Sequence, residues 1–431
     1  MLFRQFVDDD LGCASYLVGD EQAGVAAIVD PAYAIERYLD ASVEIVLVLE
    51  THTHADHVSG HGRLALEHGI PVRVHAAAGA AFPHEPFQDG EEIRLGNVVL
   101  RIVHTPGHRP EHCAVVVDDR LVLTGDSLFV GDAARPDLAV DAAEGAEGLF
   151  HSLHRLVALG DGLEVFPGHV AGSLCGANLS PERSTTIARE REQNRALVAT
   201  HEEFMCRATG PQPPRPPNME VIVELNRGPF LAAQPPLGHV DAWNGAVVLD
   251  VRDPHSFAAG HEPGAVNVPV DGTSFATKTA FVLPQRPIVL HADDPAQAQE
   301  AARRLHAVAL FDLVGWHEAG GGDRLEPVTI EELERRLAAG EVQLLDVREA
   351  SERDEGFIPG SSHLPYRNAR QAAENGLCDG QPIVTICESG PRAAIAASVL
   401  AAAGVDARPV LDGGVATWRG QTCAFRRCGR D

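Results

Sequence analysis

Residues 51–61 read THTHADHVSGH and place four histidines and one aspartate within eleven residues. The apolar run EIVLVLE stands directly before this stretch and predicts a strand that ends in a loop. Open α/β folds bind their ligands at the carboxyl ends of strands, so this loop is a candidate metal site. Strand alternation predicts that His52, His54 and Asp56 point one way, while His57 turns in from the loop.

Three later segments also end in a side chain that can bind a metal ion. IVHTPGH ends at His108, LVLTGD at Asp126 and LEVFPGH at His169, and each has a glycine beside the candidate ligand. Glycine lets the backbone turn tightly where the strand ends. The chain holds 21 histidines, and most of them need no function. The complete set, HxHxDH followed by H, D and H, nevertheless predicts a metal site.

The first half of the chain alternates short apolar runs with turns. CASYLVG, AGVAAIVDP, VVLRIVH, CAVVV and LVLTGD predict further strands, and helical spacing recurs near 61–68 and 145–159. Many strands with helices at intervals indicate two sheets covered by helices. PQPPRPP at 211–217 is a stiff polyproline-type spacer and the clearest expected domain boundary.

An internal repeat follows the spacer. LDVRDPHSFAAGHEPGAVNVP begins at Leu249 and returns as LDVREASERDEGFIPGSSHLP at Leu345, an offset of 345 − 249 = 96 residues. One offset held without a gap indicates a duplicated domain. Each copy reads strand, loop, strand and helix, which predicts a parallel α/β sheet.

The second copy contains the stretch CESGPRAAIAASVLAAAG. Cys387 ends the predicted strand IVTIC, and an alanine-rich helix is expected to begin after Gly390. Loop amides and a helix N-terminus favour an anion at this position, and Arg392 adds positive charge. These residues predict a thiolate nucleophile. A buried, inert cysteine is the competing interpretation.

The N-terminal pattern resembles the metallo-β-lactamase superfamily over about residues 1–205. The resemblance implies an αββα sandwich that holds one or two metal ions. In two-metal members one ion would bind His52, His54 and His108. The other would bind Asp56, His57 and His169, with Asp126 bridging. All of these positions are filled here, so the ligand set leaves the number of metal ions open.

The repeat resembles the rhodanese family, in which the loop cysteine carries a persulfide, so Cys387 is the expected carrier. At the same offset of 96 the first copy has His291, and Ala296 stands opposite Arg392. That loop gains Asp293 and Asp294. We therefore expect the first copy to be a catalytically silent docking or packing domain.

A metal site and a sulfur carrier in one chain resemble the persulfide (sulfur) dioxygenase branch of the superfamily, fused to sulfurtransferase domains. This resemblance implies one Fe(II), held by His52, His108 and Asp126, with positions left for persulfide sulfur and O₂. His54, Asp56, His57 and His169 would then position ligands and water.

Two further residues follow from the same resemblance. Arg135, held by Asp137, would steer an anionic thiol carrier, with an ordinary surface ion pair as the alternative. Cys175 would lie near the mouth of the site and take part in thiol exchange, with a plain buried cysteine as the alternative.

The expected activity is oxidation of a low-molecular-weight thiol persulfide by O₂ to sulfite, coupled to sulfur transfer that yields thiosulfate. One alternative is a glyoxalase II-like thioester hydrolase with two Zn(II) ions. A second alternative is a non-catalytic sulfur carrier or sensor. The identity of the thiol, whether coenzyme A, glutathione, bacillithiol or another, stays open.

Composition narrows the partners. The formal net charge of −26 argues against nucleic acid and against an anionic membrane surface. The start MLFRQFVDDDLG has no signal-peptide pattern, and eight scattered cysteines suggest reduced thiols, so we expect a cytoplasmic protein. A homodimer is an open alternative to a monomer. The expected domains are a metal domain (1–210), a linker (211–219), a rhodanese-like domain without the cysteine (220–325) and an active rhodanese domain (326–431).

Overall fold

The computed structural model describes residues 1–40, 42–171, 173–176, 179–318, 320–377, 380–420 and 422–423. The chain forms two compact units, residues 1–234 with 306–309 and residues 235–305 with 310–431. Residues 220–234, which we expected at the start of the first repeat copy, belong to the N-terminal unit. No helix in the described part of the chain is long and apolar enough to cross a membrane.

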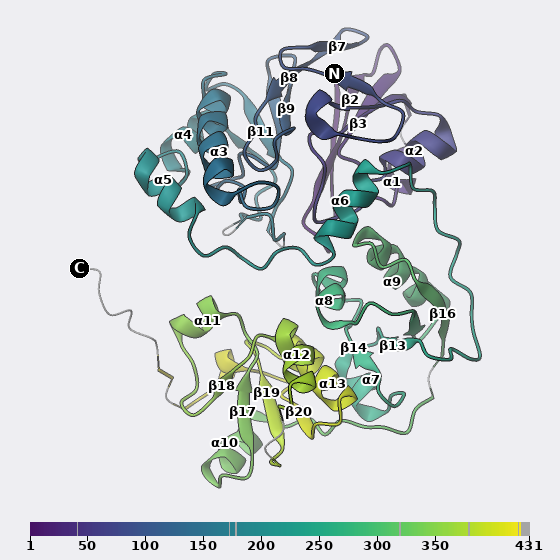
Figure 1. Cartoon of the computed structure of the whole chain (residues 1–431), viewed down its shortest axis with the longest axis vertical. Helices are drawn as coiled ribbons and strands as arrows, with labels where there is room; N and C mark the ends of the chain where they lie inside the picture. The colour runs from purple at the N-terminus through teal and green to yellow at the C-terminus, as the bar shows by residue number, and fades with distance from the viewer. Residues whose placement is uncertain are drawn as a thin grey trace. The chain divides into compact units, whose positions relative to one another are not determined.

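The N-terminal unit contains two six-stranded sheets (Figure 1). The first has the order β1 (Leu2–Val7), β2 (Ala14–Asp20), β3 (Val25–Val29), β4 (Glu44–Leu49), β5 (Val72–His75), β6 (Glu85–Phe87). The second has the order β12 (Thr185–Thr186), β11 (Glu164–Pro167), β10 (Leu121–Gly125), β9 (Cys113–Val117), β8 (Val98–His104), β7 (Glu92–Leu95). The predicted strands are therefore confirmed, and β1, β5, β6, β7 and β12 are additions to them.

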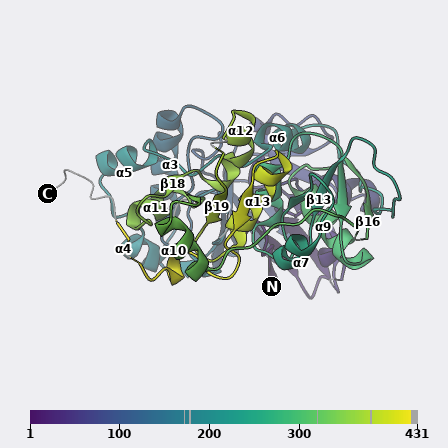
Figure 2. The same cartoon turned by 90° about the horizontal axis from the view of Figure 1, so that it is seen from below.

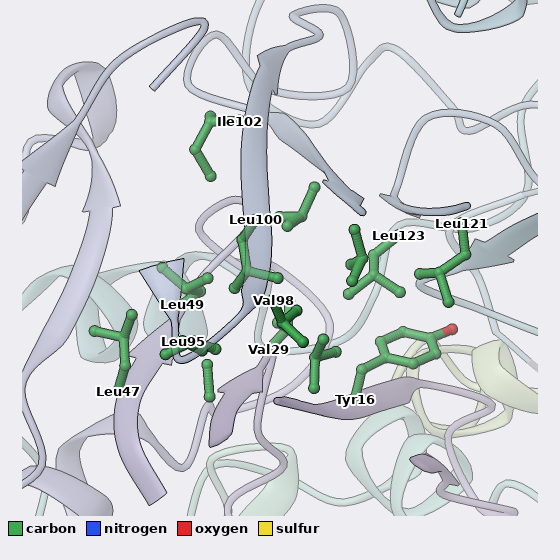
Figure 3. Close-up of a cluster of buried hydrophobic side chains, with 14 of the residues drawn as sticks. Tyr16, Val29, Leu47, Leu49, Leu95, Val98, Leu100, Ile102, Leu121 and Leu123 are labelled. Atoms are coloured by element: carbon green, nitrogen blue, oxygen red, sulfur yellow. The ribbon is translucent and has the colours of Figure 1, made fainter. Parts of the chain in front are cut away.

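The inner faces of the two sheets form the main core of this unit. Figure 3 shows Tyr16 and Leu49 from the first sheet facing Leu100 and Leu123 from the second. Alternate side chains of the strands point outward, so that Leu17 packs under the helices of the first sheet. Burial of both faces of each sheet removes a large apolar area from water, the main force that holds such a sandwich together.

Helices cover the outer faces of both sheets (Figure 1). Helices α1 (Glu36–Leu39) and α2 (His61–His68) pack on the first sheet. Helices α3 (Ala142–Val157), α4 (Ile187–Gln193) and α5 (His201–Ala208) pack on the second. The unit is thus the expected αββα sandwich, and the predicted helices near 61–68 and 145–159 are confirmed as α2 and α3.

The C-terminal unit contains two four-stranded parallel sheets, one from each repeat copy. The first has the order β14 (Val266–Asn267), β13 (Val247–Asp250), β15 (Ile288–His291), β16 (Leu313–His317). The second has the order β18 (Ser362–His363), β17 (Gln343–Asp346), β19 (Ile383–Ile386), β20 (Ala407–Pro409). The crossover helices are α7 (Pro254–Ala259), α8 (Phe275–Val282), α9 (Pro295–Ala307), α11 (Ala350–Glu355), α12 (Ala369–Glu374), α13 (Pro391–Ala402), and α10 (Ile330–Ala338) lies between the two sheets in sequence.

Helix α13 joins the two copies. It runs along its own strand β19 (Figure 2) and also contacts β14 of the first copy. The backbone amide of Asn267 donates a hydrogen bond of 3.0 Å to the Ser398 hydroxyl, and both residues are buried. The cysteine-free copy therefore packs against the helix that begins at the Cys387 loop.

Candidate metal centre and sulfur-carrier loop

The predicted ligands meet at one edge of the sandwich. Strand β4 ends at Leu49 and leads into the histidine loop, and strands β8, β10 and β11 lead to the other ligands. This places seven side chains in one cluster, in which all but Asp56 are buried: His52, His54, Asp56, His57, His108, Asp126, His169. The alternation expected for residues 52–56 does not apply, because the strand has already ended and the loop is irregular.

Three of these side chains, His52, His108 and Asp126, form a compact trio. His52 Nε2 lies 3.9 Å and His108 Nε2 3.6 Å from the same oxygen, Oδ2 of Asp126. Among the described residues, His52 Nε2 and Asp126 Oδ2 have no hydrogen-bond partner. Buried polar atoms are rarely left unpaired, so these atoms fit a bound ligand. A metal ion about 2.0–2.2 Å from each atom would fit between them.

Neighbouring groups orient both imidazoles. The Thr51 hydroxyl donates to Asp30 Oδ2 at 2.8 Å, so His52 Nδ1, 2.9 Å away, must donate to the Thr51 oxygen. His108 Nδ1 lies 2.9 Å from the backbone carbonyl of Arg135 and donates to it. Both rings therefore present the lone pair of Nε2 to the site, as metal ligation requires.

The charges of the trio suit a divalent cation. Burial lowers the pKa of His52 well below its ordinary value and also lowers the pKa of His108, so both rings are neutral. Burial alone would raise the pKa of Asp126, but the charge of His169 lowers it to about 2. Two neutral imidazoles and one carboxylate are the donor set of non-haem Fe(II) sites.

Asp56, His57 and His169 lie beside the trio. His169 is held between two carboxylates, with Nδ1 2.7 Å from Asp126 Oδ1 and Nε2 2.8 Å from Asp56 Oδ2. Burial lowers the pKa of His169, but the charges of Asp126 and Asp56 raise it to about 10. His57 Nδ1 lies 3.1 Å from Asp56 Oδ1. Because His169 takes Oδ1 of Asp126, Oδ2 of the same carboxylate is left to face His52 and His108.

His54 lies beside His52, with ring centroids 4.3 Å apart, but its Nε2 is bonded to other carboxylates. Its Nε2 lies 3.1 Å from Glu50 Oε2 and 3.4 Å from Asp30 Oδ1. Burial lowers the pKa of His54, but these two carboxylates outweigh burial and raise the pKa well above its ordinary value. Neither Glu50 nor Asp30 was selected from the sequence. Each ends an apolar run, Glu50 directly before the histidine loop and Asp30 after β3, so an acidic residue at the end of a buried strand is the signal that could have found them.

Asn226, on α6 (Met219–Arg227), braces the histidine loop. Its side-chain amide donates to the backbone carbonyls of His54 at 3.0 Å and His57 at 2.8 Å. Its Oδ1 accepts from the backbone amide of Ser59 at 2.9 Å. No sequence signal indicates this role, since Asn226 follows the proline spacer.

His112 is another residue near the trio that was not selected from the sequence. It is buried, and its ring centroid is 5.1 Å from that of His52.

The structure places Arg135 and Cys175 next to each other and both buried. The Arg135 guanidinium is paired with Asp137, at 2.7 and 2.9 Å, and donates to the carbonyl of Pro214 at 2.9 Å. Its contact with the trio runs through its backbone carbonyl, which accepts from His108. The sulfur of Cys175 lies within 4.8 Å of ligand atoms of Asp56 and His169, and burial raises the pKa of its thiol.

The loop of the second copy has the predicted form. Strand β19 ends at Ile386, Cys387 is buried, and α13 begins at Pro391 after Gly390. The backbone amide of Gly390 lies 3.1 Å from the Cys387 sulfur. Gly390 has φ +111°, and a Cβ there would meet the Leu411 carbonyl at 2.0 Å, so only glycine fits.

The pairing of Cys387 with His291 is wrong by one residue. Asp250 lies opposite His291 in the first copy, whereas Asp346 lies opposite Ile386 in the second. The residue equivalent to Cys387 is therefore Ala292, and the loop of the first copy is one residue shorter. His291 itself is fully buried in the sheet, and Ala292 has no sulfur nucleophile either.

Comparisons with known proteins agree with this architecture. The profile "Metallo-beta-lactamase superfamily" matches residues 8–169, and "Rhodanese-like domain" matches residues 239–320 and 329–421. The mitochondrial persulfide dioxygenase ETHE1 of Homo sapiens is 27% identical over 234 residues, which cover 52% of this chain and 87% of that protein.

Two solved structures are also similar. A metallo-beta-lactamase from Staphylococcus aureus subsp. aureus COL is 27% identical with a TM-score of 0.68, covering 74% of this chain and 98% of its own. ETHE1 from Myxococcus xanthus is 31% identical with a TM-score of 0.48, covering 53% and 98%. The chain thus belongs to the metallo-β-lactamase superfamily through an N-terminal domain homologous to the persulfide dioxygenase ETHE1, and it carries two rhodanese-like domains after that domain.

Proposed function

We propose that the N-terminal domain oxidises a low-molecular-weight thiol persulfide with O₂, and that the second rhodanese-like domain transfers sulfur to the product. The observation that carries the proposal is the trio His52, His108 and Asp126 in the same chain as the Cys387 loop. The similarity to a persulfide dioxygenase supports the first activity, and the rhodanese-like domains support the second.

The two reactions balance as a sequence. In the first, one persulfide, O₂ and water give sulfite, the free thiol and protons, with the outer sulfur oxidised and O₂ reduced. In the second, the Cys387 thiolate takes the outer sulfur of another persulfide and releases its thiol. Sulfite then attacks the outer sulfur of the Cys387 persulfide, which yields thiosulfate and restores the thiolate.

The trio would hold one ferrous ion. Bound Fe(II) supplies open coordination positions and a redox change that lets O₂ react with sulfur. Thr51 and Asp30 orient His52, and the Arg135 carbonyl orients His108. His169 occupies the second oxygen of Asp126 and so fixes which oxygen faces the ion. The carrier thiol would enter near Arg135 and Cys175, the residues expected to contact it.

A two-metal thioester hydrolase is the second candidate. One observation favours it: ligand atoms of His54, Asp56 and His57 lie within 4.8 Å of one another and offer a second binding set. Two zinc ions bridged by a hydroxide would then act on a carbonyl carbon. The two candidates differ in metal content and in their need for O₂.

The test uses anaerobically purified full-length protein. We expect about one iron per chain by metal analysis and uptake of one O₂ for each glutathione or coenzyme A persulfide that is oxidised to sulfite. His108→Ala and Asp126→Ala should lose both iron and oxygen uptake, whereas His57→Ala should keep its iron. Two zinc ions per chain, thioester hydrolysis and no oxygen uptake would overturn the dioxygenase proposal in favour of the hydrolase.

A further inference from the structure

Among the ion pairs in the described part of the second copy are three between an arginine and a glutamate, and two of these arginines, Arg348 and Arg392, interact with the Cys387 loop. The pairs are Arg392–Glu352, Arg367–Glu349, Arg348–Glu388. The first pair is the tightest of the three: both guanidinium nitrogens Nη1 and Nη2 of Arg392 lie 2.6 Å from a carboxylate oxygen of Glu352. The two N–H groups held by this carboxylate are not available to another oxyanion, which must compete with Glu352 for that edge of the guanidinium.

The duplicated domain gives an internal comparison. The pair Asp346–Arg348 recurs in the first copy as Asp250–Arg252, with the same side-chain contact. A pair that serves the fold is thus kept in both copies. The Glu352–Arg392 pair is not kept, because the equivalent positions, second in α9 and third in α7, hold Ala296 and Ser256.

The pair therefore occurs only in the copy that has the cysteine. Arg392 also interacts electrostatically with Cys387: the hydrogen bonds that Arg392 donates to Glu352 raise the pKa of Arg392 most, and the charge of Cys387 raises it further. The side chains of Arg392 and Glu352 are 22% and 34% exposed. Solvent reaches the pair, so an incoming oxyanion can compete with the carboxylate.

We propose that Glu352 determines the specificity of the sulfur-carrier loop by acting as an internal anion that occupies Arg392. An oxyanion such as sulfite or thiosulfate must displace Glu352 to bind the same edge of Arg392, whereas a thiol without an oxyanion reaches Cys387 with the pair intact. Glu352 thereby favours sulfur exchange with thiols, as in the loading of Cys387, and slows the transfer to sulfite without preventing it. The inference rests on the proposed function, since it assumes that Cys387 carries the sulfur.

The experiment uses the full-length protein with Cys387 loaded with sulfane sulfur, mixed with increasing sulfite or with 2-mercaptoethanol, which has no oxyanion. Glu352→Gln should raise the second-order rate with sulfite about tenfold, equivalent to about 1.4 kcal/mol, and change the rate with 2-mercaptoethanol less than about twofold. Glu352→Asp should raise the sulfite rate by a smaller factor, because the shorter carboxylate still competes.

The matched control is Glu300→Gln. Glu300 is 37% exposed and pairs with Arg303 and Arg304 in the first copy, so its removal should leave both rates unchanged. Equal effects of Glu352→Gln on both acceptors, or no effect on sulfite, would overturn the inference. Should Glu352→Gln unfold, by circular dichroism, an unaltered sulfite rate in Glu352→Asp overturns it equally. Sulfur transfer that persists in Cys387→Ser would instead refute the proposed carrier.

Discussion

Asn226 donates a hydrogen bond of 2.8 Å to the backbone carbonyl of His57, which precedes it by 169 residues. With its bonds to His54 and Ser59, every polar atom of this amide is used on the ligand loop. Asn226 lies outside the segment that matches the superfamily profile, residues 8–169. The shape of the ligand loop therefore depends on a helix that follows the proline spacer.

Replacing Asn226 should weaken metal binding. Asn226→Ala leaves two carbonyls and one amide of the loop unpaired, at about 1–3 kcal/mol each if they stay buried. We expect iron affinity, measured by chelator competition, to fall about 10- to 100-fold. Asn194→Ala is the control, since Asn194 is an equally buried amide that braces Phe129 and Asp132 instead. Equal loss of affinity in both variants would contradict a specific role for Asn226.

Removing the Thr51 hydroxyl should release the His52 ring. In Thr51→Val the Nδ1–H of His52 loses its acceptor and Asp30 loses a donor, so the preferred tautomer is no longer fixed. We expect about a tenfold lower affinity and an altered visible spectrum when Co(II) replaces iron. Thr51→Ser restores the hydroxyl and should restore both. A native spectrum in Thr51→Val would show that the hydrogen bonds from His52 to Thr51 and from Thr51 to Asp30 are dispensable.

Cys387→Ser should separate the two proposed reactions. Oxygen uptake with a persulfide should stay at the native rate, while thiosulfate formation falls at least about 100-fold, because serine cannot form a persulfide. The exposed Cys206 provides the control, and Cys206→Ser should change neither rate. Ion chromatography of sulfite and thiosulfate gives the measurement. Undiminished thiosulfate from Cys387→Ser would place the carrier elsewhere.

His291 should make the C-terminal unit sensitive to acid. Burial lowers its pKa from 6.5 to about 4, so the folded state holds it neutral while the unfolded chain binds a proton below pH 6.5. The contribution of neutral His291 to the free energy of unfolding is therefore complete above pH 6.5, and it is lost as the pH falls toward 4. The loss amounts to about 3 kcal/mol, at about 1.4 kcal/mol per pH unit.

Tryptophan fluorescence can follow this effect, since all three tryptophans of the chain, Trp243, Trp316 and Trp418, lie in the C-terminal unit. Urea unfolding of His291→Leu should depend less on pH between 6.5 and 4 than that of the native protein. His255→Asn, at a 59% exposed histidine of the same copy, should keep the native dependence. Parallel loss of stability in His291→Leu and the native protein would rule out His291 as the source.

Local patterns were enough to predict the sandwich, the parallel repeats and the ligands. His52, His108 and Asp126 each follow a short apolar run, and the loop after such a strand lies at a known edge of the sheet. The same rule located Cys387. The features that the sequence did not indicate depend on contacts between residues distant in sequence. Asn226 reaches its partners across a segment that looks like a boundary.

Two other expectations show the same limit. The Asp137 partner expected for Arg135 is present, but the Pro214 carbonyl, which also accepts from this guanidinium, was not expected. Pro214 lies 79 residues further along the chain, so sequence spacing gives no sign of this contact. His291 was aligned with Cys387 by a constant offset, and only the strand register revealed a loop shortened by one residue. A single deletion between conserved-looking landmarks leaves no trace in an alignment without gaps.

The brace from α6 has a practical consequence for dissecting the chain. A fragment cut at the proline run 211–217 would keep every expected metal ligand but lose Asn226, and its low metal occupancy would then be mistaken for a property of the ligands themselves. A fragment that continues to Gln234 retains the residue and is the appropriate length for studying the N-terminal half on its own.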